Sequence, residues 1–172
     1  MKKLLLVLFI FASVAGYSQT LKKYPVGNSG CSLYGYCDSK YKMDYSDDSS
    51  AVYTGECSIG GVTYGIICVK LLNPINDIDA AEELMISYVD YLKSNFEITK
   101  AVGYGKGHRL NNNEQTRGIL DYWEDAEQDK WKIKAWTDGH FIGFMYAYSQ
   151  KPLLETKINA FLDGLRLPKP LQ

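Results

Sequence analysis

The chain has 172 residues and a formal net charge of −1, and it contains no long run of basic residues. This composition gives no electrostatic basis for binding nucleic acid or an anionic membrane surface, so we expect neither as a partner. The length suits a single domain that buries a sufficient core without a structural metal.

The first 18 residues have the three parts of a secretory signal. Two lysines precede an apolar run at 4–15, and the small residues Gly16 and Ser18 occupy the −3 and −1 positions of a cleavage site before Gln19. The apolar run is shorter than the about 20 residues that span a bilayer. We therefore predict a signal peptide at 1–18 and a secreted or periplasmic protein with no integral membrane segment after signal cleavage.

The segment at 19–39 is rich in Gly, Ser and Tyr and has no sustained period, which predicts an irregular N-terminal arm. A single domain is expected to follow at 40–168. Apolar and β-branched runs between turn residues predict strands in this domain, and apolar spacing of i, i+3, i+4 and i+7 predicts helices. The expected strands are 41–45, 51–58, 62–72, 98–110, 116–125, 131–137 and 140–148, and the expected helices are 79–95 and 152–167.

Three details of these elements can be predicted. Spacing typical of a capping box at Asp79 predicts the start of the first helix. Gly103, Gly105 and Gly107 would share one strand face and leave room there for a bulky neighbour. The dipeptide Asp138-Gly139 predicts a two-residue hairpin turn.

Four cysteines remain after the signal, and export makes disulfides between them chemically possible. A Gly60-Gly61 turn would place Cys68 four residues beyond the strand partner of Cys57, roughly 13 Å away. Because a disulfide tolerates Cα separations only to about 7 Å, this register excludes a Cys57–Cys68 bond. We predict the local disulfide Cys31–Cys37 and a buried thiol at Cys68.

The order of elements predicts an α+β domain, an antiparallel sheet of about six to seven strands with two helices packed on it. With Thr137 opposite His140, one face of the last hairpin is apolar, and the neighbouring strand is expected to add Leu120 and Tyr122 to it. The other face mixes aromatic and charged side chains. Its expected members include Asp121, Trp123, Lys132, Lys134, Trp136, Phe141 and Met145.

Several segments together resemble the PsbP-like family of exported accessory proteins. These segments are a helix ending in Tyr91-Leu92-Lys93, a Gly-bearing strand, the strand at 116–122, a hairpin, and the closing segment 161–167. The resemblance implies an α-β-α sandwich and binding or accessory roles more than catalysis. The four cysteines and the arm depart from the pattern, so no partner or metal residue transfers from the family, and fold analogy is a weak guide to function.

The sequence contains no recognisable catalytic or cofactor-binding motif, so we expect no cofactor. Two histidines do not supply the three protein ligands of a catalytic zinc, so no metal site is expected. Fourteen tyrosines and three tryptophans favour a binding surface on the mixed face. The candidate ligand-binding residues are Trp123, Lys132, Trp136 and Phe141.

The leading hypothesis is a non-catalytic exported binding or accessory protein for an unknown protein or small-molecule ligand. One alternative is a small exported enzyme with dispersed acid and base residues drawn from Asp121, Glu124, His108 and His140. Another is a structural subunit of an envelope assembly. A helix that covers Trp123 and Trp136 would make them core and remove the proposed surface.

Overall fold

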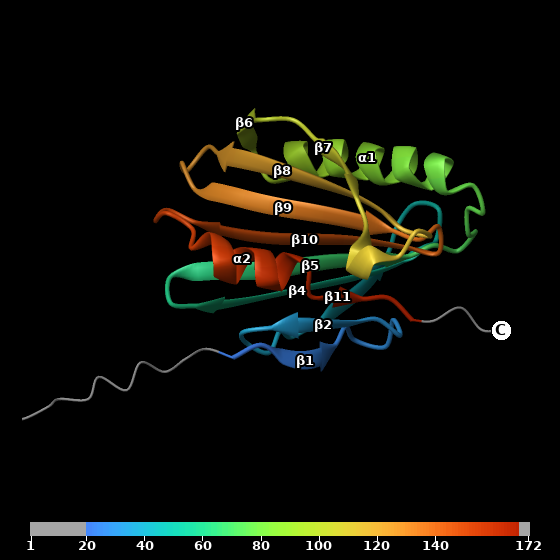
Figure 1. Ribbon diagram of the computed structural model, residues 1–172, viewed down its shortest axis with the longest axis horizontal. Helices are drawn as coiled ribbons and strands as arrows, with labels where there is room; N and C mark the ends of the chain where they lie inside the picture. Colours follow the sequence, from blue (N-terminus) through green and yellow to red (C-terminus); the bar gives the residue numbers. More distant parts are fainter. Residues whose placement is uncertain (1–19, 169–172) are drawn as a thin grey trace, which may run out of the picture.

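The computed structural model describes residues 20–168, so the predicted signal peptide lies outside the described residues. An eight-stranded antiparallel sheet forms its centre (Figure 1), in the order β3-β4-β5-β10-β9-β8-β6, and β7 also pairs with β8. The α+β class is confirmed, with more strands than expected. The strands are β3 (Lys42–Tyr45), β4 (Ala51–Ile59), β5 (Val62–Lys70), β6 (Ile98–Ala101), β7 (Gly105–His108), β8 (Arg117–Asp125), β9 (Lys130–Thr137) and β10 (Phe141–Ser149).

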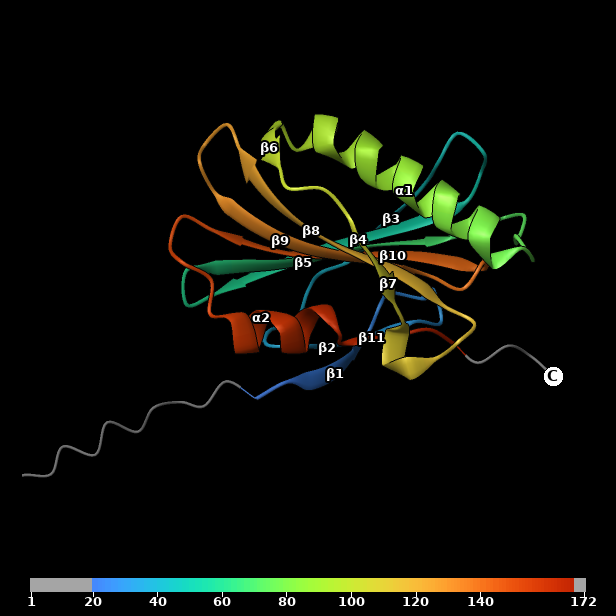
Figure 2. The ribbon, with the colours of Figure 1, turned by 45° about the horizontal axis from the view of Figure 1, so that its top comes forward.

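Helix α1 (Ile78–Asn95) covers one face of this sheet (Figure 2). The carboxylate of Asp77 caps it by accepting the backbone N–H of Asp79 at 3.0 Å, so the helix begins slightly before the expected capping box. The predicted apolar stripe is confirmed, because α1 buries one side chain on each turn. These side chains are Ala81, Met85, Val89 and Leu92. Among residues 20–168, no helix has the length and apolar content needed to cross a bilayer.

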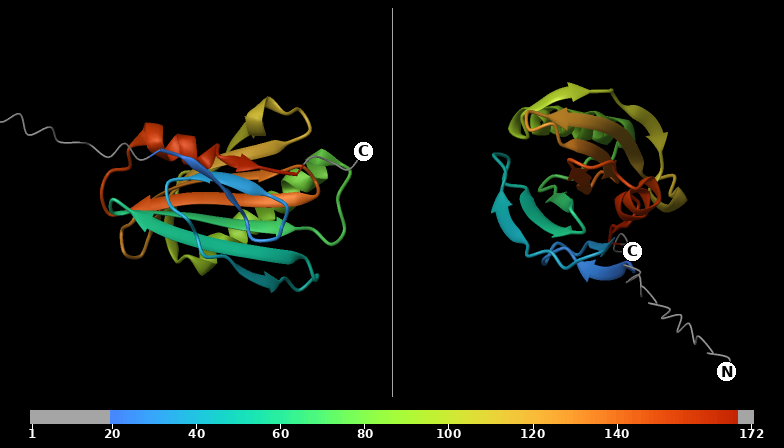
Figure 3. Two further views of the ribbon diagram at one scale, coloured as in Figure 1. Left: turned by 90° about the horizontal axis from the view of Figure 1, so that it is seen from below. Right: turned by 90° about the vertical axis from the view of Figure 1, so that its left-hand side faces the viewer.

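The opposite face is covered by α2 (Glu155–Leu162) and by a second, three-stranded sheet of β1 (Lys22–Pro25), β2 (Ser32–Gly35) and β11 (Leu165–Arg166). In the view from below (Figure 3), the blue strands β1 and β2 lie in front of the large sheet and α1 lies behind it. The prediction of an irregular N-terminal arm was therefore wrong. The arm forms strands because its partner β11 comes from the far end of the chain, where no local pattern reveals it.

The closing helix is also shorter than expected. It stops at Leu162 because the Gly164 carbonyl accepts the backbone N–H of Tyr34 at 3.0 Å, and Leu165 then pairs with Leu33. The strand expected at 98–110 is broken into β6 and β7. Gly103 and Gly107 adopt φ of +104° and +91°, and a Cβ at either would meet no atom within 4 Å. Glycine is therefore required at these two positions for the left-handed backbone conformation, and not to make room for a neighbouring side chain.

The two hairpins differ in how well their register could be predicted. The β4–β5 hairpin has the expected register. In β9–β10, Ile142 pairs with Thr137, where His140 was expected. The Asp138 carboxylate accepts the backbone N–H groups of His140 and Phe141, each at 2.9 Å, and so holds a longer loop. Because the shift is two residues, each side chain keeps its expected face.

The side chains of β8 point to the opposite faces of the sheet from those predicted. Asp121 pairs with Ile133, and Trp123 pairs with Trp131, so both point toward α1. Tyr122 points away from α1, toward Lys132, and Leu120 is its neighbour on that face. The orientation depends on the turn at 126–129, which the Asp125 carboxylate closes by accepting the backbone N–H of Asp129 at 2.9 Å.

The predicted Cys31–Cys37 disulfide is wrong, and the structure has Cys37–Cys57 instead, with a Cα–Cα distance of 6.0 Å. Strand β2 lies between Cys31 and Cys37, and an extended strand of about 3.3 Å per residue carries its two ends too far apart for one bond. Cys57 and Cys68 are not joined, as predicted, and Cys68 is a buried thiol.

Candidate functional site

The four predicted ligand-binding side chains do not form a surface. Their exposed fractions are 3% for Trp123, 2% for Lys132, 2% for Trp136 and 6% for Phe141. Trp123 belongs to the core beneath α1, whereas Trp136 and Phe141 belong to the core on the opposite face. The aromatic surplus of the sequence is therefore used on both sides of the sheet as core, and the expected binding face is absent from the described chain.

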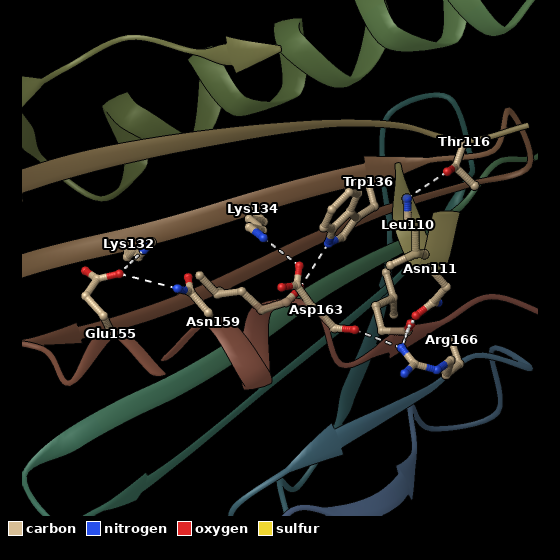
Figure 4. A network of polar contacts seen from close by, with 12 residues as sticks. Leu110, Asn111, Thr116, Lys132, Lys134, Trp136, Glu155, Asn159, Asp163 and Arg166 are labelled. Atoms are coloured by element: carbon tan, nitrogen blue, oxygen red, sulfur yellow. Dashed lines mark hydrogen bonds and ion pairs between the residues drawn. The ribbon is translucent and has the colours of Figure 1, made fainter. Parts of the chain in front are cut away.

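The buried lysines of β9 hold α2 against the sheet (Figure 4). Lys134 Nζ lies 2.6 Å from Asp163 Oδ1, and Lys132 forms an ion pair with Glu155. On the same strand, the Trp136 indole N–H donates to the carbonyl of Leu162, the last residue of α2, at 3.1 Å. These lysines pair with half-exposed carboxylates of α2 and its C-terminus, so their role is structural.

Three of the four candidate acid and base residues are held in separate contacts. Asp121 is fully buried and accepts from the Trp123 indole N–H at 2.7 Å and from the backbone N–H of Gly103 at 2.9 Å. Glu124 forms ion pairs with Lys100 and Lys130. His108 packs edge-on against the ring of Trp136. The structure therefore offers no common site for acid–base catalysis by these residues.

A cavity of about 500 Å³ lies beside the β9–β10 loop and is lined by the fourth candidate, His140. Two of its polar side chains hold the loops around it. Asp138 closes the β9–β10 loop, and Arg166 donates to the carbonyl of Asp163 at 2.8 Å. No group of three metal-ligating side chains occurs anywhere in residues 20–168.

The larger cavity is a groove of about 1080 Å³ between α1 and the strands β3 and β4. Its floor is one cross-strand row, in which Ile142 pairs with Val69, Val69 with Val52, and Val52 with Asp44 on the edge strand. The row is apolar over three strands and ends in a carboxylate. This arrangement suits a ligand with an apolar body and a cationic end.

The α1 wall of the groove is aromatic. Leu84, Tyr88 and Tyr91 line it, and the rings of Tyr88 and Tyr91 meet edge-on with centroids 6.2 Å apart. Tyr91 is 63% exposed, so its ring is available to a ligand. Sequence reasoning missed this wall, although Leu84, Tyr88 and Tyr91 recur at i, i+4 and i+7 and form a second apolar stripe beside the buried one.

Three carboxylates and one lysine line the groove: Asp44, Asp47, Asp48 and Lys42. The side-chain hydroxyl of Ser46, together with the backbone N–H and the hydroxyl of Ser50, donates to Asp48 and lowers the pKa of that carboxyl. Burial, and next the nearby Asp48 charge, raise the pKa of Tyr88. The groove is therefore negatively charged at neutral pH, with neutral tyrosine rings beside the charge.

The chain matches no protein-family model, and the search of curated proteins finds no relative.

Proposed function

We propose that this protein is a non-catalytic binding protein that acts after export and holds a cationic amphiphile in the groove between α1 and β3–β4. The observation that carries the proposal is the row on the groove floor, apolar from Ile142 to Val52 and ending in the Asp44 carboxylate. A volume of about 1080 Å³ is large enough for a small organic ligand.

The chemistry of the walls supports the same class of ligand. Tyr88 and Tyr91 present aromatic faces, which attract quaternary and primary ammonium groups through the ring quadrupole. The neighbouring carboxylates add favourable charge, and they outnumber the single lysine that lines the groove. A binding role also agrees with what the PsbP-like resemblance implies.

Export is supported by the signal-like residues 1–18 and by the Cys37–Cys57 disulfide, since disulfides persist in oxidising compartments. Catalysis is not part of the proposal, because Asp121, Glu124 and His108 occupy separate structural contacts.

Calorimetric titration with dodecyltrimethylammonium and dodecyl sulfate, each below its micellar concentration, tests the proposal. We expect saturable binding of the ammonium compound at a one-to-one ratio and much weaker binding of the sulfate. Equal binding of both amphiphiles, or binding of neither, would contradict the proposed ligand class.

Two variants locate the site. We expect Asp44→Asn to weaken ammonium binding about threefold, the scale of an exposed charge pair, and Tyr91→Ala to weaken it about tenfold. Tyr122→Ala is the matched control, because Tyr122 is a partly exposed tyrosine of β8 outside the groove. A Tyr122→Ala variant that loses as much affinity as Tyr91→Ala would place the ligand elsewhere.

A further inference from the structure

Two cysteines that are not bonded lie side by side in the core between the two sheets. Their Sγ atoms are 3.6 Å apart, and both side chains are buried. Cys31 directly precedes β2 of the small sheet, and Cys68 lies in β5 at the centre of the large sheet. We infer that these two thiols form a second disulfide, Cys31–Cys68, in the mature protein.

Hydrogen bonds already fix the backbone of Cys31 in a position suited to this bond. The backbone N–H of Val26 donates to the Cys31 carbonyl at 3.0 Å, and the backbone N–H of Cys31 donates to the Ser29 hydroxyl oxygen at 3.0 Å. Cys68 is fixed in the middle of a strand that pairs on both sides. A disulfide has an S–S distance of about 2.05 Å, so the sulfurs must approach by about 1.5 Å, which side-chain rotation can provide.

The position of the pair complements the first disulfide. Cys37 directly follows the β2 region and is bonded to Cys57 on β4, whereas Cys31 precedes β2 and faces β5, the next strand of the large sheet. The two bonds would fasten both ends of β2 to adjacent strands. The small sheet would then be covalently joined to the large one at two points instead of one.

The oxidation balances with a small-molecule disulfide, such as oxidised glutathione, as the oxidant. The Cys31 thiolate attacks this disulfide and releases one thiolate, and the Cys68 thiolate then attacks the Cys31 sulfur and releases the second. The protein loses two protons and two electrons, and the oxidant becomes two thiols. A hydrogen bond from the Cys68 thiol lowers the pKa of Cys31, which favours Cys31 as the first nucleophile.

Refolding the reduced chain with oxidised and reduced glutathione tests the inference without any assumption about export. After denaturation and treatment with iodoacetamide, we expect no alkylated cysteine and a mass about 4 Da below that of the fully reduced chain, about 2 Da for each bond. Peptide mapping should recover a Cys31–Cys68 peptide beside the Cys37–Cys57 peptide. Alkylation of both Cys31 and Cys68 in the folded, oxidised product would overturn the inference.

A second measurement isolates the new bond from the first. In the Cys37→Ser/Cys57→Ser variant, only the inferred bond responds to a reductant. We expect this variant to melt at a higher temperature without dithiothreitol than with it, and the difference to vanish when Cys31→Ala and Cys68→Ala are added. Equal melting temperatures with and without reductant would contradict the inference, and the mapping of the wild-type chain decides the matter if this variant does not fold.

Discussion

The indole ring of Trp136 lies over Gly118, its cross-strand partner on β8, so closely that a Cβ on Gly118 would be 2.2 Å from two ring carbons. We predict that Gly118→Ala lowers the free energy of unfolding by about 1–3 kcal/mol, because the ring has to shift within a filled core. Gly105→Ala on the neighbouring β7 is the control, since the nearest atom there is 3.7 Å away. Urea denaturation of both variants measures the difference, and equal losses would contradict the packing.

Trp136 should behave as a core residue. We predict that Trp136→Ala and Phe144→Ala each cost about 3–5 kcal/mol of stability, because each removes a large, fully buried side chain. Trp136→Ala also leaves the Leu162 carbonyl without its indole donor. A Trp136→Ala variant with nearly unchanged stability in urea denaturation would restore the surface expected from the sequence.

The buried carboxylate of Asp121 is predicted to stabilise the fold. It accepts two backbone N–H groups, from Gly103 and Tyr122, and the Trp123 indole N–H, and it lies 3.6 Å from Lys93 Nζ. Asp121→Asn should cost about 3–5 kcal/mol, because the amide presents two donors to a site built from donors. Lys93→Met is the comparison and should cost less, since Lys93 is partly exposed. A larger loss in Lys93→Met in chemical denaturation would contradict this view.

Acid should destabilise the fold through His108. Burial, and next the positive charge of Lys134, lower the pKa of His108, while Asp163 acts weakly in the opposite direction. The unfolded chain therefore binds this proton more readily, so the stability that the neutral imidazole contributes is lost as the pH falls below about 6.5. We predict that His108→Gln flattens the fall in melting temperature between pH 7.5 and 5.5. The matched control is His140→Gln, which removes an exposed imidazole, and an unchanged slope in His108→Gln would contradict the assignment.

Signal cleavage is predicted to leave a protein that begins at Gln19. Gly16 and Ser18 supply the small residues that a signal peptidase requires, and the apolar segment before them has the length of a signal core. The intact mass of the protein purified from its native host measures the start of the chain. Retention of Met1 in the purified protein would remove the basis for the proposed location.

Features set by neighbouring residues could be predicted from the sequence. The α1 stripe from Ala81 to Leu92 follows from helical spacing, and the β4–β5 register follows from the Gly60-Gly61 turn. Features set by distant partners could not. The burial of Lys134 depends on Asp163, 29 residues away, and lysine by itself suggests an exposed face.

The candidate site was missed for a related reason. Its floor and its α1 wall come from separate parts of the chain, and the stripe of Leu84, Tyr88 and Tyr91 does not reveal which strands lie opposite it. The orientation of β8 depends on the turn at 126–129, whose closure by Asp125 does not follow from the composition of the turn.

Strand β11 makes the completion of the three-stranded sheet depend on a contact between distant parts of the chain. Leu33 pairs with Leu165, so β2 obtains its second neighbour only from a strand that lies far along the chain. Contacts between such distant residues form slowly, because a long loop has to close first. We therefore expect the pairing of β2 with β11 to form late in folding, after the short-range β1–β2 hairpin.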